Sequence, residues 1–205
     1  MKRKTLDIIF SIGGMALACL LLVLGLVLQN QANFAQDYVK SQLAEQKISF
    51  TPVKGLSPEE KKAACLVKWA GQPLTTGKQA ECYANEYIGL HVTEINEGKT
   101  YSQSSGEARA LAAKAEAAMK ANPDDPEAQA LDGQAKAAAG KTDALFKGET
   151  LRGLLLTTYG FSIFGERAAQ AATVAFLVAA VLAIASIAGF IHAFTGHEHR
   201  KEAAA

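Results

Sequence analysis

Cys65 and Cys82 are the residues of this 205-residue chain that point most directly to covalent chemistry. Both follow the first long apolar stretch, in a segment that we expect outside a membrane, where paired thiols oxidise. A disulfide closing a loop of this size is worth roughly 3 kcal/mol. A metal or redox pair is the less favoured alternative, because the C-x-x-C spacing is missing and only His91 is near in sequence. We therefore predict a structural disulfide.

His91 is the single histidine between the two long apolar stretches. On a helix it shares a side with Ile88 and Ile95, and Tyr87 lies one turn before it. A lone histidine on such a face is usually packed and hydrogen-bonded. We favour that role over a ligand or catalytic role, and we expect Tyr83 and Tyr87 to pack in a core or on a partner.

Sequence motifs for other chemistries are missing. The chain has no G-x-x-x-x-G-K-[ST], G-x-G-x-x-G, G-x-S-x-G or C-x-x-C-H motif. Its formal net charge is +1, which gives no reason to expect nucleic-acid binding. We predict a protein that is not an enzyme, with no catalytic, cofactor-binding or metal-binding residues.

Two uncharged apolar stretches, residues 8–28 and 168–194, organise the chain. Each is long enough for a transmembrane helix, which takes about 20 apolar residues. A lipoprotein signal ending at Cys19 is the alternative for the first stretch. We favour an intact span, because apolar residues continue past Cys19 to Leu28, where a lipoprotein would have a polar tether.

Basic residues give the expected orientation. Lys2, Arg3 and Lys4 precede the first span, and positive charges favour the cytoplasmic side. The prediction is a bacterial plasma-membrane protein with both termini cytoplasmic and residues 29–167 extracytoplasmic. The predicted segments are a cytoplasmic N-terminus at 1–7, an extracytoplasmic helical domain at 29–147 and a cytoplasmic tail at 195–205.

The segment 148–165 is apolar but too short to span. Leu154 to Phe164 would form only ~16 Å of helix, against roughly 30 Å of hydrocarbon. The sequence Gly165-Glu166-Arg167 is expected to break the chain before the second span. We predict an interfacial helix that lies at the outer leaflet or against a partner.

Local signals divide the extracytoplasmic segment. A stalk at 34–46 is expected to continue the first span, followed by disulfide-stapled helices at 58–97 and an alanine-rich helical hairpin at 105–140. The predicted helix starts are capping boxes at Ser57–Glu60 and Ser104–Glu107, and a cap at Asp125 ahead of Pro126.

Small residues recur three or four apart along the second span, which allows close helix contact. We favour packing of the two spans on each other, with docking on another membrane protein as the alternative. The candidate partner contacts are Leu151, Leu154, Leu155, Tyr159, Phe161, Phe164, Ala172, Ala175, Ala179 and Ala183.

The turn of the hairpin resembles a tetratricopeptide unit. The stretch ANPDDPEAQALDGQAKAAAG has an Asn-Pro linker and a following helix of small residues. The resemblance covers about one repeat, whereas stacked repeats generally need three or more. It therefore implies a helical hairpin and not a peptide-binding solenoid.

Both ends of the chain resemble a group of small actinobacterial two-span membrane proteins. The similar stretches are MKRKTLDIIFSIGG and LFKGETLRGLLLTTYGFSIFG, and more loosely TTGKQAECYANEYIGLH. Members are often labelled aromatic ring-opening dioxygenases. Such enzymes hold a non-haem iron through histidines and a carboxylate. Since this chain has one histidine between its spans, we rank that activity last.

The predicted fold is mostly α: two transmembrane helices flanking a small helical extracytoplasmic domain with one disulfide, plus an interfacial helix before the second span. The expected function is that of a non-catalytic accessory or assembly subunit of a larger membrane complex. A respiratory cytochrome bc–oxidase assembly is the host suggested by analogy. The alternative is a free-standing envelope protein whose outer domain binds a ligand. Expected partners are the lipid bilayer and integral membrane proteins, with no cofactor.

Overall fold

The computed structural model describes residues 3–195, which are mostly helical. Within them, α1 (Arg3–Glu45) and α6 (Pro126–Thr195) are long and apolar enough to cross a membrane, which confirms the prediction of two long apolar helices. The predicted tail at 195–205 lies outside the described residues except for Thr195. The chain divides into a helix-pair unit, residues 1–38 and 162–205, and a central domain, residues 39–161.

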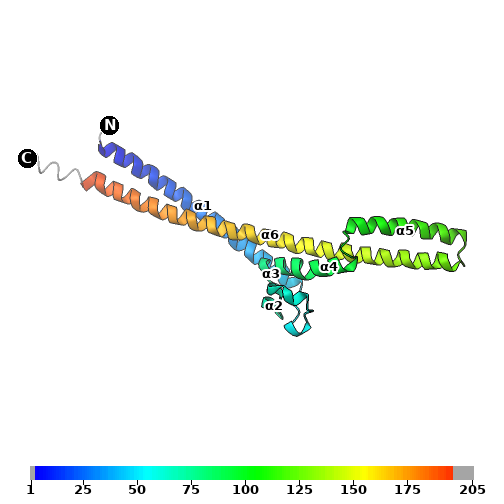
Figure 1. Cartoon of the computed structure of the whole chain (residues 1–205). Coiled ribbons are helices and arrows are strands. Elements are labelled where there is room, and N and C mark those ends of the chain that lie inside the picture. The colour runs from blue at the N-terminus through cyan, green and yellow to red at the C-terminus, as the bar shows by residue number, and fades with distance from the viewer. Residues whose placement is uncertain (1–2, 196–205) are drawn as a thin grey trace, which may run out of the picture. The chain divides into compact units, whose positions relative to one another are not determined.

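In the helix-pair unit, α1 and α6 run antiparallel and pack through small residues (Figure 1). These buried residues recur at heptad spacing, which is the repeat of a left-handed helix pair. We call them the seam: Ser11, Ala18, Gly25 and Ala32 on α1, and Gly165, Ala172, Ala179, Ser186 and Ala193 on α6. Small side chains let the two backbones approach closely, which stabilises a helix pair in lipid.

Several glycines of the pair lie where the contact between the helices is tight. A Cβ built on Gly14 would lie 2.5 Å from the Ser186 Oγ. A Cβ built on Gly165 would lie 2.8 Å from the Ala35 Cβ, and alanine has no rotamer by which to move away. Gly165 therefore needs a residue without a side chain, whereas the Ser186 hydroxyl opposite Gly14 can rotate away.

Replacing Gly165 by leucine is expected to loosen the seam. Overpacking of this kind costs about 1–3 kcal/mol, so backbone amides near Ala35 should exchange hydrogen roughly tenfold faster or more in detergent-solubilised protein. Hydrogen–deuterium exchange measures this. Gly13→Leu is the matched control, because a Cβ on Gly13 meets no atom within 4 Å. Equal exchange in the two variants would contradict the close contact at Gly165.

Helix α6 is continuous from Pro126 to Thr195, so the predicted boundaries within it are wrong. The returning helix of the hairpin does not end at Gly140, and the segment 148–165 is not a separate helix.

A glycine inside a helix costs only about 1 kcal/mol relative to alanine, and no proline follows Pro126 in α6. Gly165 serves the seam, and a Cβ on Gly148 would lie 2.6 Å from the Val92 Cγ2. These two glycines therefore allow packing instead of breaking the helix.

The central domain places short helices around a small core. After α1, which contains the predicted stalk, an extended piece pairs Ser49 with Pro73 in an isolated bridge. The helices that follow are η1 (Val53–Gly55), η2 (Glu60–Lys62), α2 (Ala64–Trp69), α3 (Gly77–Cys82), the π-helical η3 (Tyr83–Ile88), α4 (Gly89–Ile95) and α5 (Tyr101–Ala121). The largest side chains that are fully buried in the core are Leu66, Leu74 and, from α6, Leu145.

Of the three predicted helix starts, the one at Asp125 is present, the one at Ser57 forms its hydrogen bonds without beginning an α-helix, and the one at Ser104 is wrong. Ser57 and Glu60 form their reciprocal box, although the chain makes a turn and η2 there and α2 begins only at Ala64. Asp125 accepts from the Glu127 N–H at 3.0 Å, as predicted for the start of α6. The box at Ser104 does not form, because Thr100 caps α5 one turn earlier. The buried Ser104 hydroxyl instead accepts from the Asn96 side-chain amide at 2.6 Å.

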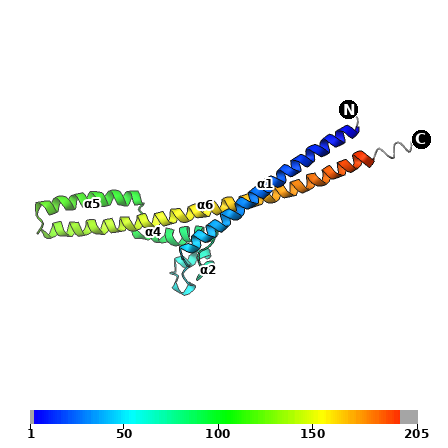
Figure 2. The ribbon, with the colours of Figure 1, turned by 180° about the vertical axis from the view of Figure 1, so that it is seen from behind.

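The predicted alanine-rich hairpin is present. Figures 1 and 2 both show α5 beside the first part of α6. The two helices meet through buried alanines: Ala108 and Ala115 on α5, and Ala128 and Ala135 on α6. Because alanine buries little apolar area, this contact stabilises the hairpin only weakly.

Candidate functional site

The predicted disulfide is present. Cys65 of α2 is bonded to Cys82 at the end of α3, with 6.2 Å between their Cα atoms. Cys82 is buried in the core and Leu66, next to Cys65, is almost fully buried. The bond therefore fastens two very short helices across the centre of the domain.

Glu60 and His91 form a second link across the same domain. Glu60 is only 5% exposed, and its carboxylate accepts from the Ser57 N–H at 2.6 Å. Its other oxygen lies 3.1 Å from the His91 Nε2, and the Glu94 carboxylate lies 3.9 Å from Nδ1. The hydrogen-bonded role predicted for His91 is confirmed, although its ring is half exposed.

Hydrogen bonding governs the pKa of Glu60. The backbone N–H of Ser57 is the largest influence and lowers the pKa of Glu60, burial raises it, and His91 lowers it again. The net result is a pKa below the ordinary value of 4.5. The ionised carboxylate therefore stabilises the folded domain.

Acid is expected to destabilise the central domain through Glu60. A pKa lower in the folded than in the unfolded state gives stability that is complete above about pH 4.5 and is lost as the pH falls through the folded pKa. Glu60→Gln should lower the free energy of unfolding at pH 7 by ~1–2 kcal/mol and flatten its dependence on pH below 4.5. Urea unfolding in detergent, followed by fluorescence of Trp69, the single tryptophan, measures both effects.

Glu59→Gln is the matched control for Glu60. Glu59 pairs with Lys62 on the exposed surface, where such pairs contribute little. If Glu60→Gln and Glu59→Gln have the same free energy of unfolding at pH 7 and at pH 4, the buried Glu60 carboxylate contributes no more to stability than the exposed Glu59 carboxylate.

Aromatic rings connect His91 to the core. Tyr87 contacts both the His91 ring and Tyr83, with 4.7 Å between ring centroids in each pair, and Phe50 contacts Tyr83 and Trp69 at 5.4 and 5.9 Å. Burial is the main cause of the raised pKa of Tyr83. These contacts confirm a packing role for the tyrosines. Among residues 3–195, no three His, Cys, Asp or Glu side chains are placed to hold a metal ion.

The predicted partner contacts in the central domain differ in exposure. Leu151, Leu154 and Phe161 are exposed, by 38%, 62% and 39%. Leu155 is buried in the core, so its prediction as a partner contact is wrong: its side of α6 packs on the domain itself. Tyr159 accepts a hydrogen bond from the Lys78 ammonium at 3.1 Å, which raises the pKa of Lys78.

The predicted contacts in the helix-pair unit also differ. Phe164 is 76% exposed and available. Ala172, Ala175 and Ala179 are buried against α1, so they are not available to a partner, and Ala183 is partly buried. The spacing of the small residues therefore corresponds to contact between α1 and α6, which is the alternative that we favoured from the sequence.

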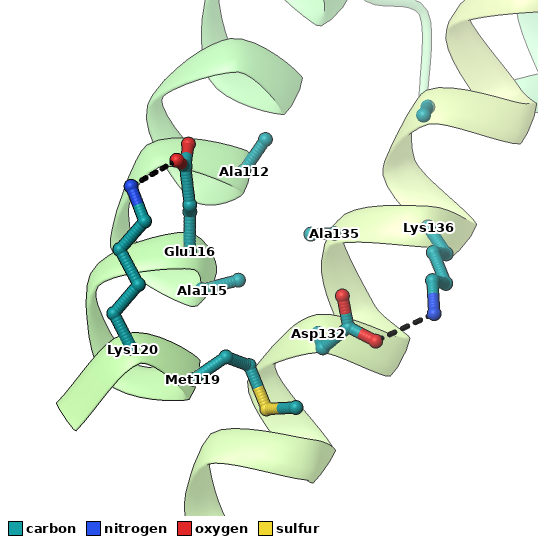
Figure 3. A pocket seen from close by; sticks show the side chains of 9 residues that line it. Ala112, Ala115, Glu116, Met119, Lys120, Asp132, Ala135 and Lys136 are labelled. Atoms are coloured by element: carbon teal, nitrogen blue, oxygen red, sulfur yellow. Dashed lines mark hydrogen bonds and ion pairs between the residues drawn. The ribbon is translucent and has the colours of Figure 1, made fainter. Parts of the chain in front are cut away.

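A groove between α5 and α6 is a feature that sequence reasoning missed. Two hollows of about 500 and 340 Å³ adjoin at Ala112 and Ala139. Figure 3 shows alanines facing the larger hollow, with Glu116 and Lys120 on the α5 side and Asp132 and Lys136 on the α6 side. The alternation of alanine with charged residues at helical spacing was the available signal, but it fits a solvated hairpin equally well.

Comparison with known proteins does not add to this geometry. No family model matches the chain, and no curated protein or solved structure matches it either.

Proposed function

We propose that the protein is a non-catalytic accessory or assembly subunit of a larger bacterial plasma-membrane complex. The observation that carries the proposal is the row of exposed apolar side chains on α6 outside the uncharged span, Leu151, Leu154 and Phe161. Exposed apolar side chains that cluster on one element mark interaction surfaces. A respiratory cytochrome bc–oxidase assembly is the first host to test.

The proposal places α1 and the last part of α6 across the membrane, with the central domain outside the cell. Two features support this arrangement. The Lys4 ammonium lies over the Phe194 ring at 5.0 Å, so both spans reach the same side together with the basic N-terminus. The Cys65–Cys82 bond is typical of an oxidising compartment.

Purification from native membranes tests the proposal. The full chain, carrying an affinity tag, is solubilised in a mild detergent and isolated from cells grown under respiring conditions. We expect other membrane subunits to co-purify in a fixed ratio. A lone monomer or self-dimer would contradict an accessory role and favour a free-standing envelope protein. Tight, stoichiometric iron in the pure protein would instead support the dioxygenase label.

A further inference from the structure

A hollow of about 240 Å³ opens between α1 and α6, close to the N-terminal end of α1. Both helices belong to the helix-pair unit at this point. We call the hollow the notch and define it by Asp7, Phe10, Ser11 and Gly14 of α1 and by Ser186 and Gly189 of α6. Its residues include two hydroxyls and a carboxyl group, so the notch is a polar recess in a mostly apolar surface.

The two serines bring hydroxyl groups to the notch that have no partner. Ser11 and Ser186 are each only 4% exposed. The Ser186 Oγ lies 2.5 Å from the Cβ position built on Gly14, and the Ser11 Oγ faces Gly189 in the same way. The Cα of a glycine is no acceptor for a hydroxyl, and within residues 3–195 neither serine makes a hydrogen bond. By contrast, the Thr173 hydroxyl donates to the carbonyl one turn before it at 3.0 Å.

An unpaired hydroxyl is unfavourable in hydrocarbon, where no water completes its hydrogen bonds. Ser11 lies three residues, roughly 5 Å, inside the uncharged stretch that begins at Ile8, and Gly14 and its contact Ser186 lie roughly 9 Å inside. The polar layer of a bilayer is about 5–7 Å thick on each side of the hydrocarbon. The notch therefore extends from the headgroups to the first part of the acyl chains. A phospholipid carries its ester carbonyls, which accept hydrogen bonds, at this depth.

Opposite charges lie at the outer end of the notch. The Lys4 ammonium lies over the Phe194 ring at 5.0 Å, and the Asp7 carboxyl group lines the notch itself. Phe194 ends the second uncharged stretch and Asp7 directly precedes the first, so both groups lie at the same edge of the hydrocarbon. Within the described residues, neither Lys4 nor Asp7 makes an ion pair. An ammonium attracts a phosphate and a carboxylate accepts from an ammonium, so this pair matches a headgroup that carries both charges.

We propose that the notch binds one aminophospholipid of the surrounding bilayer. The Ser11 and Ser186 hydroxyls donate to its ester carbonyls, the Lys4 ammonium pairs with its phosphate and the Asp7 carboxylate accepts from its ammonium. This inference rests on the membrane placement in the proposed function, and it adds a lipid ligand that the accessory role does not require.

A transmembrane helix matches the notch less well than a lipid does. In hydrocarbon, the backbone carbonyls of a helix are bonded to its own N–H groups, so they are poor acceptors for Ser11 and Ser186. A second copy in the same membrane orientation would bring its own Asp7 to the level of this Asp7, where the like charges repel. The unpaired hydroxyls and the mixed charge at the outer end therefore favour a lipid.

Native mass spectrometry of the delipidated full chain in detergent tests the site with three lipids that differ in headgroup. They are phosphatidylethanolamine, phosphatidylglycerol, which lacks the ammonium, and phosphatidylcholine, whose methylated ammonium donates no hydrogen bond. We expect one phosphatidylethanolamine per chain, bound roughly tenfold or more tightly than either of the other lipids, because only it satisfies Asp7. Equal binding of the three lipids, or no binding, would overturn the inference.

The double variant Ser11→Ala, Ser186→Ala removes both hydroxyl donors and should weaken the binding of phosphatidylethanolamine roughly tenfold or more. Thr173→Val is the matched control, because the exposed Thr173 hydroxyl is already paired within α6. Ala185→Phe fills the notch from its exposed rim and should also prevent binding. Its control is Ala188→Phe, because Ala188 is exposed but does not line the notch. Binding at the wild-type level in either the double variant or Ala185→Phe would overturn the inference.

Photo-crosslinking in cells identifies the occupant. Benzoylphenylalanine at Ala185 is compared with benzoylphenylalanine at Ala188. We expect adducts at 185 to be enriched in aminophospholipid relative to adducts at 188, which sample the bulk lipid. Adducts at 185 with another polypeptide or with a second copy would overturn the inference.

The outcomes separate this inference from the proposed function. If alkaline carbonate releases the chain from membranes without detergent, it does not span the bilayer and both fail. If the chain stays in the membrane and co-purifies with a complex, but binds the three lipids equally, only the lipid inference fails.

Discussion

Leu145→Ala is expected to lower the free energy of unfolding of the central domain by about 2–5 kcal/mol. Leu145 lies on α6 with no exposed surface, in the same core as Leu66 and Leu74. Truncation leaves a cavity that rigid helices can close only in part, so the loss exceeds the transfer energy of the missing carbons. Small domains have only 5–15 kcal/mol of stability, so a loss of this size is a large fraction of the total.

Trp69 fluorescence during urea unfolding in detergent reports this loss, because Trp69 packs against the same core. Phe146→Ala is the control. Phe146 is the next residue along α6, but it is exposed and contacts only the exposed Tyr101 among the ring pairs described. Its truncation should cost less than about 1 kcal/mol. Similar losses for both variants would mean that α6 does not complete the core of the domain.

Strong local patterns made the helices and the disulfide predictable from sequence. Three of these patterns depend only on residues close together in the chain. They are the uncharged apolar runs long enough to span a membrane, the Ser57–Glu60 hydrogen-bond box and the Asp125–Pro126 helix start. The Cys65–Cys82 pairing was predictable because the segment between the spans contains no other cysteine. These features needed no knowledge of distant contacts.

Features decided by distant contacts were not predictable in the same way. From sequence alone, Gly165 predicts a helix break, because its contact with Ala35 is known only from the structure. Leu155 likewise predicts an exposed partner contact, because only the structure shows that the core covers it. The link between Glu60 and His91 joins residues far apart in sequence, and no spacing rule connects them. Tertiary packing overrides local propensity at such positions.

Removal of the disulfide is expected to lower the stability of the central domain by about 3 kcal/mol. The bond joins residues with a sequence separation of 17, and the chain-entropy model assigns a loop of this length that magnitude. α2 and α3 have six residues each, too few to be stable helices in water without tertiary contacts. The stability of this domain therefore depends on the disulfide more than the stability of a domain with a large core would.

The test compares the double variant Cys65→Ala, Cys82→Ala with the wild type, with and without reductant. Reductant should destabilise the wild type to the level of the double variant and leave the double variant unchanged. Cys19→Ala is the control, because Cys19 is a free, exposed cysteine on α1. Since the bond forms only where thiols oxidise, free thiols at Cys65 and Cys82 in protein isolated without reductant would contradict both the bond and the extracytoplasmic location proposed for the central domain.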